Sequence, residues 1–157
     1  MPASLKESRL DFSKALLGAY ANLAVLQVRL YNDEDQVVRP SFKEMVYLYT
    51  IWKFDNCTAS DLVEIFNSSK ALISQTVISM EKKGFISRKK DPSDNRRQII
   101  TVSEEIMGTY AMELQLIDEA LKYKSKQYSM EEALQAARIV LDITDTMLRI
   151  KNENKQF

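Results

Sequence analysis

Apolar residues recur at steps of three and four along most of the chain, which is the spacing of a helix that buries one side or more. Three helix starts are marked by a Ser or Thr with an acidic residue three positions later, in "SFKE" from Ser41, "TASD" from Thr58 and "SMEE" from Ser129. In such a capping box the two residues satisfy each other's exposed backbone donors. We therefore expect helices over about 8–31, 42–55, 58–66, 70–83, 104–126 and 130–151.

Two of these helices are short and lie on either side of a tight polar turn. "DLVEIF" is followed by "NSS", whose side chains favour caps and turns, and Gly84 suits the left-handed turn that ends the second helix. Two short helices across such a turn form a helix-turn-helix. The helical period gives the second one an inward face of Ile73, Thr76, Val77 and Met80, and an outward face of Ala71, Ser74, Gln75, Ile78, Ser79 and Lys82.

The outward face of that second helix is small, polar and almost uncharged. A Gln such as Gln75 pairs well with adenine, and Ala or Ile side chains contact the methyl group of thymine. The face therefore suits an approach to the base edges of DNA. It suits an ordinary exposed surface equally well, except that Ile78 would then have no purpose.

After Gly84 the apolar period changes to two. "FISRKK" alternates and "QIITVS" is rich in β-branched residues, with "DPSDNRR" between them, so the segment predicts a β-hairpin. A hairpin packed beside a helix-turn-helix is a winged helix. Arg96 and Arg97 then lie at its tip, either as a solvated hairpin end or as a basic finger for the narrow, electronegative minor groove. Asp94 is close enough in sequence to orient Arg96 by a salt bridge.

The long helices at the two ends carry more apolar surface than one small domain can cover. The first is apolar nearly all round, and the last carries two apolar stripes, so each needs more than one partner. We expect a mainly α fold, a single domain over 1–157, with dimerisation helices at 8–40 and 104–157 and a winged-helix lobe with a two-stranded β wing at 41–103. The alternative for the last helix is burial within its own chain. Its stripes are Met130, Leu134, Ala137, Leu141, Thr144 and Leu148, and Ala136, Val140, Ile143, Met147 and Ile150.

Composition narrows the classes of function. The chain has 157 residues, 45% of them hydrophobic, with three Gly, three Pro, one Cys and no His. Without His there is no His-based catalytic triad and the commonest zinc ligand is missing, so we expect no enzyme, no metal site and no cofactor. A single Cys favours a reducing, cytoplasmic setting. The uncharged segment 15–28 is too short to span a bilayer, and Glu7 and Asp11 argue against a signal peptide, so we expect no membrane association.

The charge is unevenly distributed although the net charge is zero. Residues 68–97 carry 8 basic and 3 acidic side chains, whereas 1–67 carry 7 and 9, and 104–157 carry 7 and 10. A polyanion would therefore meet the molecule at its middle, in the predicted winged helix. The alternative to a polyanion-binding site is that these lysines simply lie on a solvated face.

Residues from about Thr58 to Glu105 resemble the winged helix-turn-helix of the MarR family of bacterial transcription regulators. The matching stretches are "SSK" at the start of the second short helix, "MEKKGFISR" leading into the first strand, and "DPSDNRRQ" before "ITVSEE". The flanking helices match the family in layout, so the resemblance covers essentially the whole chain. It implies a homodimer that binds double-stranded DNA at a pseudo-palindrome, with residues 69–83 in the major groove and 91–97 in the minor groove, most simply as a repressor.

The resemblance also implies roles for single residues. It assigns DNA contacts to Ser69, Lys70, Ser74 and Gln75, and makes Arg96 the wing arginine with Asp94 as its partner. The family usually has arginines where this chain has Gln75 and Ser79, and a paired arginine where it has Asn95, so we expect weaker or more selective DNA binding, with Arg97 in compensation. The full expected DNA-binding set is Ser69, Lys70, Ala71, Ser74, Gln75, Ser79, Lys82, Arg88, Asp94, Arg96 and Arg97.

Regulation by a small molecule is a further implication. Family members commonly bind small, often aromatic, effectors between the dimer helices and the DNA-binding lobe, and here Tyr20, Tyr49 and Trp52 are the candidates. Cys57, just before a predicted helix, is an alternative as an oxidation sensor. The lack of His argues against the zinc-sensing branch of the family. A different alternative is a winged helix that binds a protein instead of DNA, through Leu72 and Ile78.

Overall fold

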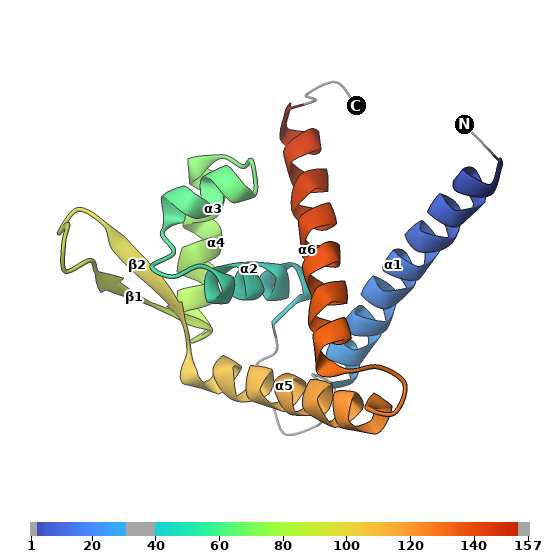
Figure 1. Cartoon of the computed structure of the whole chain (residues 1–157). Helices are drawn as coiled ribbons and strands as arrows, with labels where there is room; N and C mark the ends of the chain where they lie inside the picture. The colour runs from blue at the N-terminus through green and yellow to red at the C-terminus, as the bar shows by residue number, and fades with distance from the viewer. Residues whose placement is uncertain (1–2, 31–39, 154–157) are drawn as a thin grey trace. The chain divides into compact units, whose positions relative to one another are not determined.

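The computed structural model describes residues 3–30 and 40–153, with side chains from residue 8 on. Within these residues six helices and two strands follow the predicted order (Figure 1). Tyr31, where the first helix was expected to end, and the adjoining boundary region lie outside the described residues. The elements are α1 (Ala3–Leu30), α2 (Phe42–Lys53), α3 (Ala59–Ile65), α4 (Lys70–Lys82), β1 (Ile86–Lys90), β2 (Gln98–Val102), α5 (Glu104–Lys124) and α6 (Met130–Glu153).

All three predicted capping boxes are present and fix where α2, α3 and α6 begin. In each, the cap hydroxyl accepts a hydrogen bond from the backbone N–H three residues later, and the acidic side chain accepts one from the cap residue's own N–H. These bonds satisfy donors that a helix start would otherwise leave unpaired. The pairs are Ser41 with Glu44, Thr58 with Asp61, and Ser129 with Glu132.

A residue with a positive φ follows each of the two helices of the helix-turn-helix. Gly84 has φ 78° directly after α4, as its position in the sequence predicts, and Asn67 has φ 44° in the turn between α3 and α4. Glycine and asparagine tolerate this left-handed conformation better than other residues do. The turns therefore bring α3 and α4 together as a helix-turn-helix.

The wing is an antiparallel hairpin in which Ile86 faces Val102 and Lys90 faces Gln98. A third segment joins it, because the N–H of Ile100 donates to the carbonyl oxygen of Cys57 at 2.7 Å, and Thr58 and Ile99 form a bridge. The segment just before α3 thus extends the wing sheet by one residue pair. The sequence did not predict this connection, since a single pair leaves no alternating pattern to detect.

The chain divides into two compact units, which we describe separately. One spans residues 38–127 and contains α2, the helix-turn-helix, the wing and α5; the other contains α1 and α6. Helix α5 thus lies in the same compact unit as the winged helix. Ile106 and Tyr110, in the first two turns of α5, are buried in the core of the lobe.

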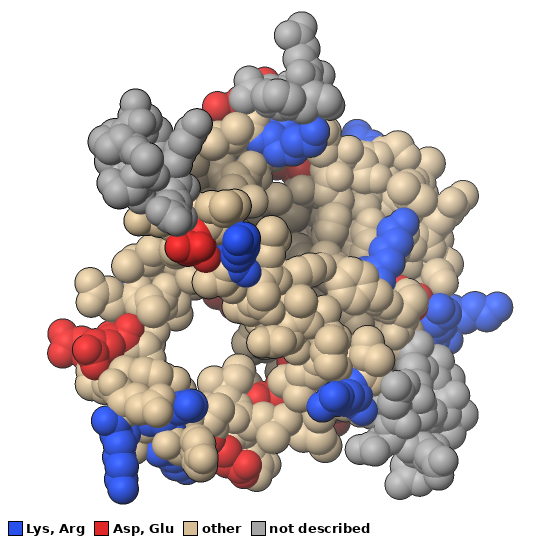
Figure 2. Space-filling view, turned by 90° about the vertical axis from the view of Figure 1, so that its right-hand side faces the viewer, with Lys and Arg blue, Asp and Glu red and all other residues tan. Residues whose placement is uncertain are grey.

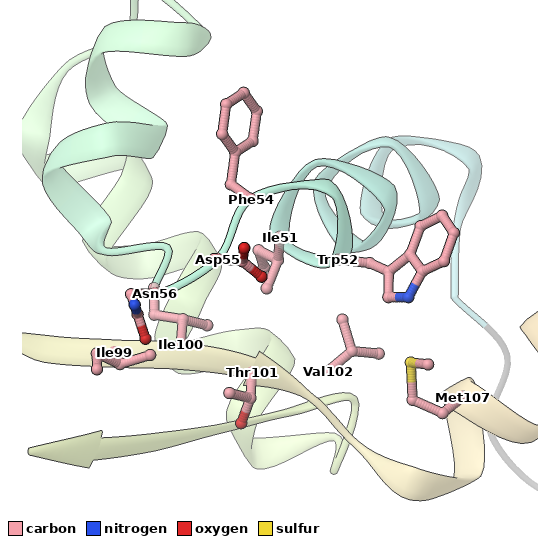
Figure 3. Close-up of a pocket in the computed structure, with 10 residues that line it drawn as sticks. All are labelled: Ile51, Trp52, Phe54, Asp55, Asn56, Ile99, Ile100, Thr101, Val102 and Met107. Atoms are coloured by element: carbon pink, nitrogen blue, oxygen red, sulfur yellow. The ribbon is translucent and has the colours of Figure 1, made fainter. Parts of the chain in front are cut away.

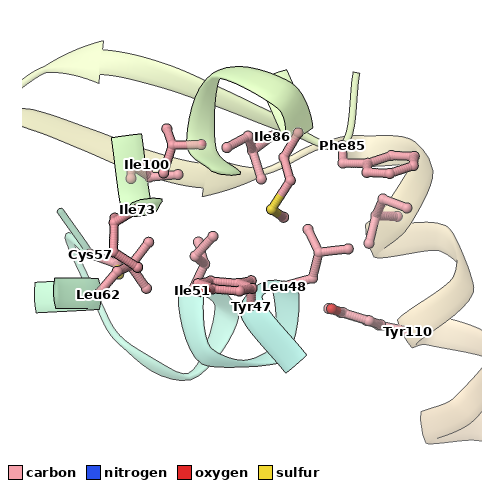
Figure 4. Close-up of a cluster of buried hydrophobic side chains, with 13 residues drawn as sticks. Tyr47, Leu48, Ile51, Cys57, Leu62, Ile73, Phe85, Ile86, Ile100 and Tyr110 are labelled. Carbon is pink, nitrogen blue, oxygen red and sulfur yellow. The ribbon is translucent and has the colours of Figure 1, made fainter. Parts of the chain in front are cut away.

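The core of the 38–127 unit, hereafter the lobe, draws side chains from every one of its elements (Figure 4). Leu48 of α2, Leu62 of α3 and Ile73 of α4 are fully buried. Tyr47 stacks on Phe66, with ring centroids 4.1 Å apart. This shared core holds α4 against the wing, and so sets the geometry of the surface that both present.

The unit of α1 and α6 has no comparable core. None of the described side chains of α6 is buried, and large apolar residues such as Leu17 of α1 and Leu148 of α6 are 65% and 60% exposed. Figure 2 shows a face of the molecule on which uncharged side chains cover most of the surface and charged ones are scattered. Within the described residues, no helix is long and apolar enough to cross a membrane.

Candidate DNA-binding surface

Helix α4 divides into two faces as its sequence predicts. Ile73, Val77 and Met80 are buried, and Thr76 is half-buried beside them. The opposite face is exposed along the whole helix, and it includes Ile78, an apolar residue that is 52% exposed. The other exposed residues of this face are Ala71, Ser74, Gln75, Ser79 and Lys82.

Both ends of α4 are fixed by side chains. Ser69 is the N-cap, and its hydroxyl oxygen accepts a hydrogen bond from the N–H of Leu72 at 3.2 Å. Lys70, next to it, is exposed. At the other end, the Lys83 ammonium lies 2.7 Å from the Glu44 carboxylate at the start of α2. Partial burial alone would raise the pKa of Glu44, but the hydrogen bonds from Lys83 and Ser41 bring that pKa below its usual value.

The wing tip is organised around Asp91, which is buried. Its carboxylate accepts hydrogen bonds from the hydroxyl and the backbone N–H of Ser93, at 2.6 and 2.8 Å, and these bonds lower the pKa of Asp91. The Arg97 guanidinium lies 3.8 Å from the same carboxylate, and the Asp91 N–H donates to the Arg97 carbonyl oxygen at 3.1 Å. Arg97 therefore helps to close the loop at the tip.

The expected salt bridge between Asp94 and the Arg96 guanidinium is not formed. The Asp94 carboxylate instead accepts a hydrogen bond from the backbone N–H of Arg96 at 2.9 Å. An aspartate two residues before a backbone donor closes a turn in this way, which leaves its carboxylate poorly placed to orient the side chain. Among the interactions of the described residues, the Arg96 guanidinium takes part in no ion pair. Arg96 is exposed and lines a hollow together with residues at the start of α3.

Arg88, on the first wing strand, is held within the lobe. Its guanidinium donates to both carboxylate oxygens of Glu81 on α4, through Nε at 3.1 and 3.0 Å, and to the Gln98 side-chain oxygen on β2 at 3.3 Å. The hydrogen bonds between the two residues raise the pKa of Arg88 and lower that of Glu81. Arg88 thus connects both wing strands to α4. The sequence had predicted only a DNA contact for this residue.

Two of the three effector candidates belong to the 38–127 unit, and the third belongs to the other unit. Tyr49 and Trp52 lie near Tyr110, with ring centroids 4.7 and 5.6 Å from it. The Tyr49 hydroxyl donates to the Glu113 carboxylate, and burial raises the pKa of Glu113 in spite of this bond. Tyr49 therefore packs into the junction of α2 and α5, whereas Trp52 is exposed beside an open groove (Figure 3). Tyr20 is exposed on α1, in the other unit.

Cys57 is poorly suited to sense oxidants. Its side chain is only 1% exposed, and burial together with the nearby charge of Asp61 raises the pKa of the thiol from 9.0 to about 11. The thiolate is the species that reacts with oxidants, and a buried thiol with a raised pKa is largely inert. Cys57 packs in the core of the lobe, and its carbonyl oxygen accepts a hydrogen bond from the N–H of Ile100. These structural contacts explain the presence of Cys57 without a redox role.

Sequence comparison finds a family match over the winged helix. Residues 41–97 match the MarR family, and this region contains α2, the helix-turn-helix, β1 and the wing tip. No curated protein matches the chain. The family is one of transcription regulators and not of enzymes, in line with the expectation from the sequence.

Solved structures of low sequence identity share the fold over nearly the whole chain. FabT of Streptococcus pneumoniae, in complex with DNA, has 16% identity and a TM-score of 0.62 over 91% of this chain and 99% of its own. A MepR mutant from a multidrug-resistant S. aureus clinical isolate has 18% identity and a TM-score of 0.63, over 87% and 96%. A MarR-like transcriptional regulator from Thermotoga maritima has 18% identity and a TM-score of 0.56, over 94% and 97%.

The wing is short and antiparallel and follows directly on α4, and the matched region ends at the wing tip. The fold continues on both sides of that region into the long helices that the solved structures share. The family match over residues 41–97 thus coincides with the winged helix, and the helices around it share the fold of these solved structures.

Proposed function

We propose that the chain acts as a homodimeric, sequence-specific repressor in the cytoplasm, with α4 of each copy in a major groove and each wing in the adjacent minor groove. The exposed face of α4 is the main support. It presents Gln75, Ser74 and Ala71 with almost no charge, so the side chains there suit base edges more than phosphates. Such a face favours binding to a preferred DNA sequence over high affinity for DNA in general.

The other groups of this surface have different proposed roles. Arg96 is an exposed cation of the wing tip without an ion-pair partner among the described residues, and a guanidinium in the minor groove senses its width and potential. Lys70 and Lys82 flank the polar face of α4 and are placed to contact phosphates. Ser69 and Asp94 act through the backbone, by capping α4 and by closing the wing turn, so we infer that they position the surface.

The homodimer is proposed from the apolar surface of α1 and α6. Two long helices with exposed leucines, valines and isoleucines on several sides would not remain uncovered in water. A second copy offers the same surface in return and would cover it with two-fold symmetry. Such symmetry presents two α4 helices to successive major grooves of a pseudo-palindromic operator. In this scheme α1 and α6 form the dimerisation region, and the lobe reads DNA.

Selection of preferred sites from randomised duplex DNA tests the proposal. Enrichment of a two-fold symmetric sequence by the purified protein is the expected result. No enrichment even at low salt, where phosphate contacts are strongest, would contradict it. That outcome would favour the alternative of a protein-binding winged helix, whose contact surface would include the exposed Leu72 and Ile78.

A second prediction separates the two roles considered for Arg88. If Arg88 positions the wing, Glu81→Gln should weaken DNA binding by about two- to fivefold, because the link between α4 and the strands is lost. If Arg88 instead contacts DNA, the same change would free its guanidinium and strengthen binding. We expect the first result from fluorescence anisotropy on the selected site. Glu64→Gln, which removes an exposed carboxylate of α3, is the control for the change in net charge.

The salt dependence of DNA binding by the Arg88→Ala variant is an independent test of the role of Arg88. Each phosphate contact contributes about 0.9 to the slope of log affinity against log salt concentration. We expect this variant to bind more weakly with an unchanged slope. A slope reduced by about one contact would show that Arg88 touches the DNA backbone.

A further inference from the structure

An open groove of about 520 Å³ lies within the lobe, between the C-terminal end of α2, strand β2 and the first turn of α5 (Figure 3). Ten residues line it, and seven of them are apolar. Asn56 and Thr101 are polar without charge. Asp55 is the only charged residue of the lining, so the groove combines apolar and polar surface with a single negative charge.

The walls of the groove suit a flat ring. Trp52 stands at one side and is 46% exposed, so much of its indole ring is open to solvent. The side chains of Met107 and Val102 lie close to it in Figure 3. An indole face attracts other rings and cations, and a thioether sulfur packs well against aromatic groups.

The Asp55 carboxylate is not neutralised by the protein. It is exposed and takes part in no ion pair within the described part of the chain. The nearest cation in sequence, the Lys53 ammonium, lies over the Phe54 ring at 5.8 Å from its centroid. Arg97 lines an adjoining hollow together with Asp55, but its guanidinium lies 3.8 Å from the Asp91 carboxylate. A positive charge that enters the groove would therefore find a carboxylate without an ion-pair partner among the described residues, whereas a carboxylate ligand would be repelled.

We propose that this groove binds a flat organic cation, with its ring against Trp52 and its positive charge toward Asp55. The proposal names a chemical class for the small-molecule effector, and only its regulatory part rests on the proposed function. Ile99 and Thr101, which line the groove, belong to β2, the strand that follows the wing arginines. A ligand in contact with β2 biases the wing and so alters DNA affinity.

Ligand binding can be measured directly, because Trp52 is the only tryptophan of the chain. The probe is N-methylquinolinium, and its anionic counterpart is naphthalene-2-carboxylate, which has two fused rings and the opposite charge. We expect saturable quenching of Trp52 fluorescence by the cation, beyond the collisional quenching of N-acetyltryptophanamide. The anion should bind at least about threefold more weakly. Equal binding of the two probes, or no saturable quenching, would overturn the proposal.

Substitution of Asp55 tests the role of its charge. Asp55→Asn keeps the shape of the side chain and should weaken binding of the cation by about three- to tenfold, with little effect on the anion. Asp118→Asn removes an exposed carboxylate of α5 away from the groove and serves as the control. If Asp55→Asn binds the cation as tightly as the wild type does, the proposal is wrong.

A last experiment tests regulation separately from binding. DNA affinity is measured with and without saturating N-methylquinolinium, in the wild type and in Asp55→Asn. A change in the wild type that is reduced in the variant would support an effector site, and the variant controls for binding of the cation to DNA itself. If the probe binds but DNA affinity is unchanged, the regulatory part fails and the ligand site remains. If no DNA is bound at all, the proposed function fails, and the fluorescence result is unaffected.

Discussion

Replacing Arg96 by alanine is expected to weaken DNA binding by about ten- to hundredfold, the range for losing one well-placed arginine contact. The reason is that the Arg96 guanidinium has no ion-pair partner among the described residues, whereas the Arg97 guanidinium lies 3.8 Å from the Asp91 carboxylate. The slope of log affinity against log salt concentration should fall by about one contact. Fluorescence anisotropy on the selected site, at two or more salt concentrations, measures both quantities.

Two further variants make the Arg96 result interpretable. Arg138→Ala removes an exposed arginine from α6 and has the same effect on net charge, so it should change DNA affinity little. Arg97→Ala should act mainly on the wing turn, through the loss of its contact with Asp91. If Arg96→Ala binds as the wild type does while Arg97→Ala loses affinity and slope, the minor-groove role belongs to Arg97.

Replacing Leu141 by aspartate should convert the proposed dimer to a monomer. An unpaired charge in an apolar interface costs several kcal/mol, so we expect the dimer dissociation constant to rise by at least about a hundredfold. Loss of the second half-site should in turn weaken binding to the full operator by at least about a hundredfold. Light scattering after size-exclusion chromatography gives the oligomeric state, and the anisotropy assay gives the affinity.

The control for Leu141→Asp is Gln135→Asp, which adds the same side chain on α6 at an exposed polar position outside the apolar stripes. It should leave both the dimer and DNA binding intact. Circular dichroism adds a further distinction. If α6 were buried in its own chain, Leu141→Asp would lower the helix content, whereas loss of a dimer contact keeps the lobe folded. A variant that remains a dimer would show that Leu141 lies outside the interface.

Local rules predicted most of the lobe from sequence. The three capping boxes, the left-handed Gly84 and the two faces of α4 each depend on residues within a few positions of one another, and the structure confirms all of them. The apolar period likewise located the helices and the hairpin. These features are recoverable because their causes lie in neighbouring residues.

The errors and omissions concern contacts between different elements or choices between equivalent partners. The ion pair of Glu81 with Arg88 joins a helix to a strand, and the bond from Ile100 to Cys57 joins segments more than forty residues apart in sequence. Asp94 had both the backbone and the side chain of Arg96 within reach, and sequence does not show which one it binds. The groove beside Trp52 exists only once three elements have packed.

If the chain docks on DNA as proposed, the bond between the Cys57 carbonyl and Ile100 limits the kind of DNA that fits it. Thr58, which caps α3, takes part in the same connection, so the wing and the helix-turn-helix are joined at the start of that motif. A lobe built in this way holds a fixed separation between a major-groove element and a minor-groove element. On the proposed docking, a duplex fits when its helical twist places the major and minor grooves at that separation. Overwound or underwound DNA of identical sequence would then fit less well, which makes the superhelical state of the chromosome an input to binding.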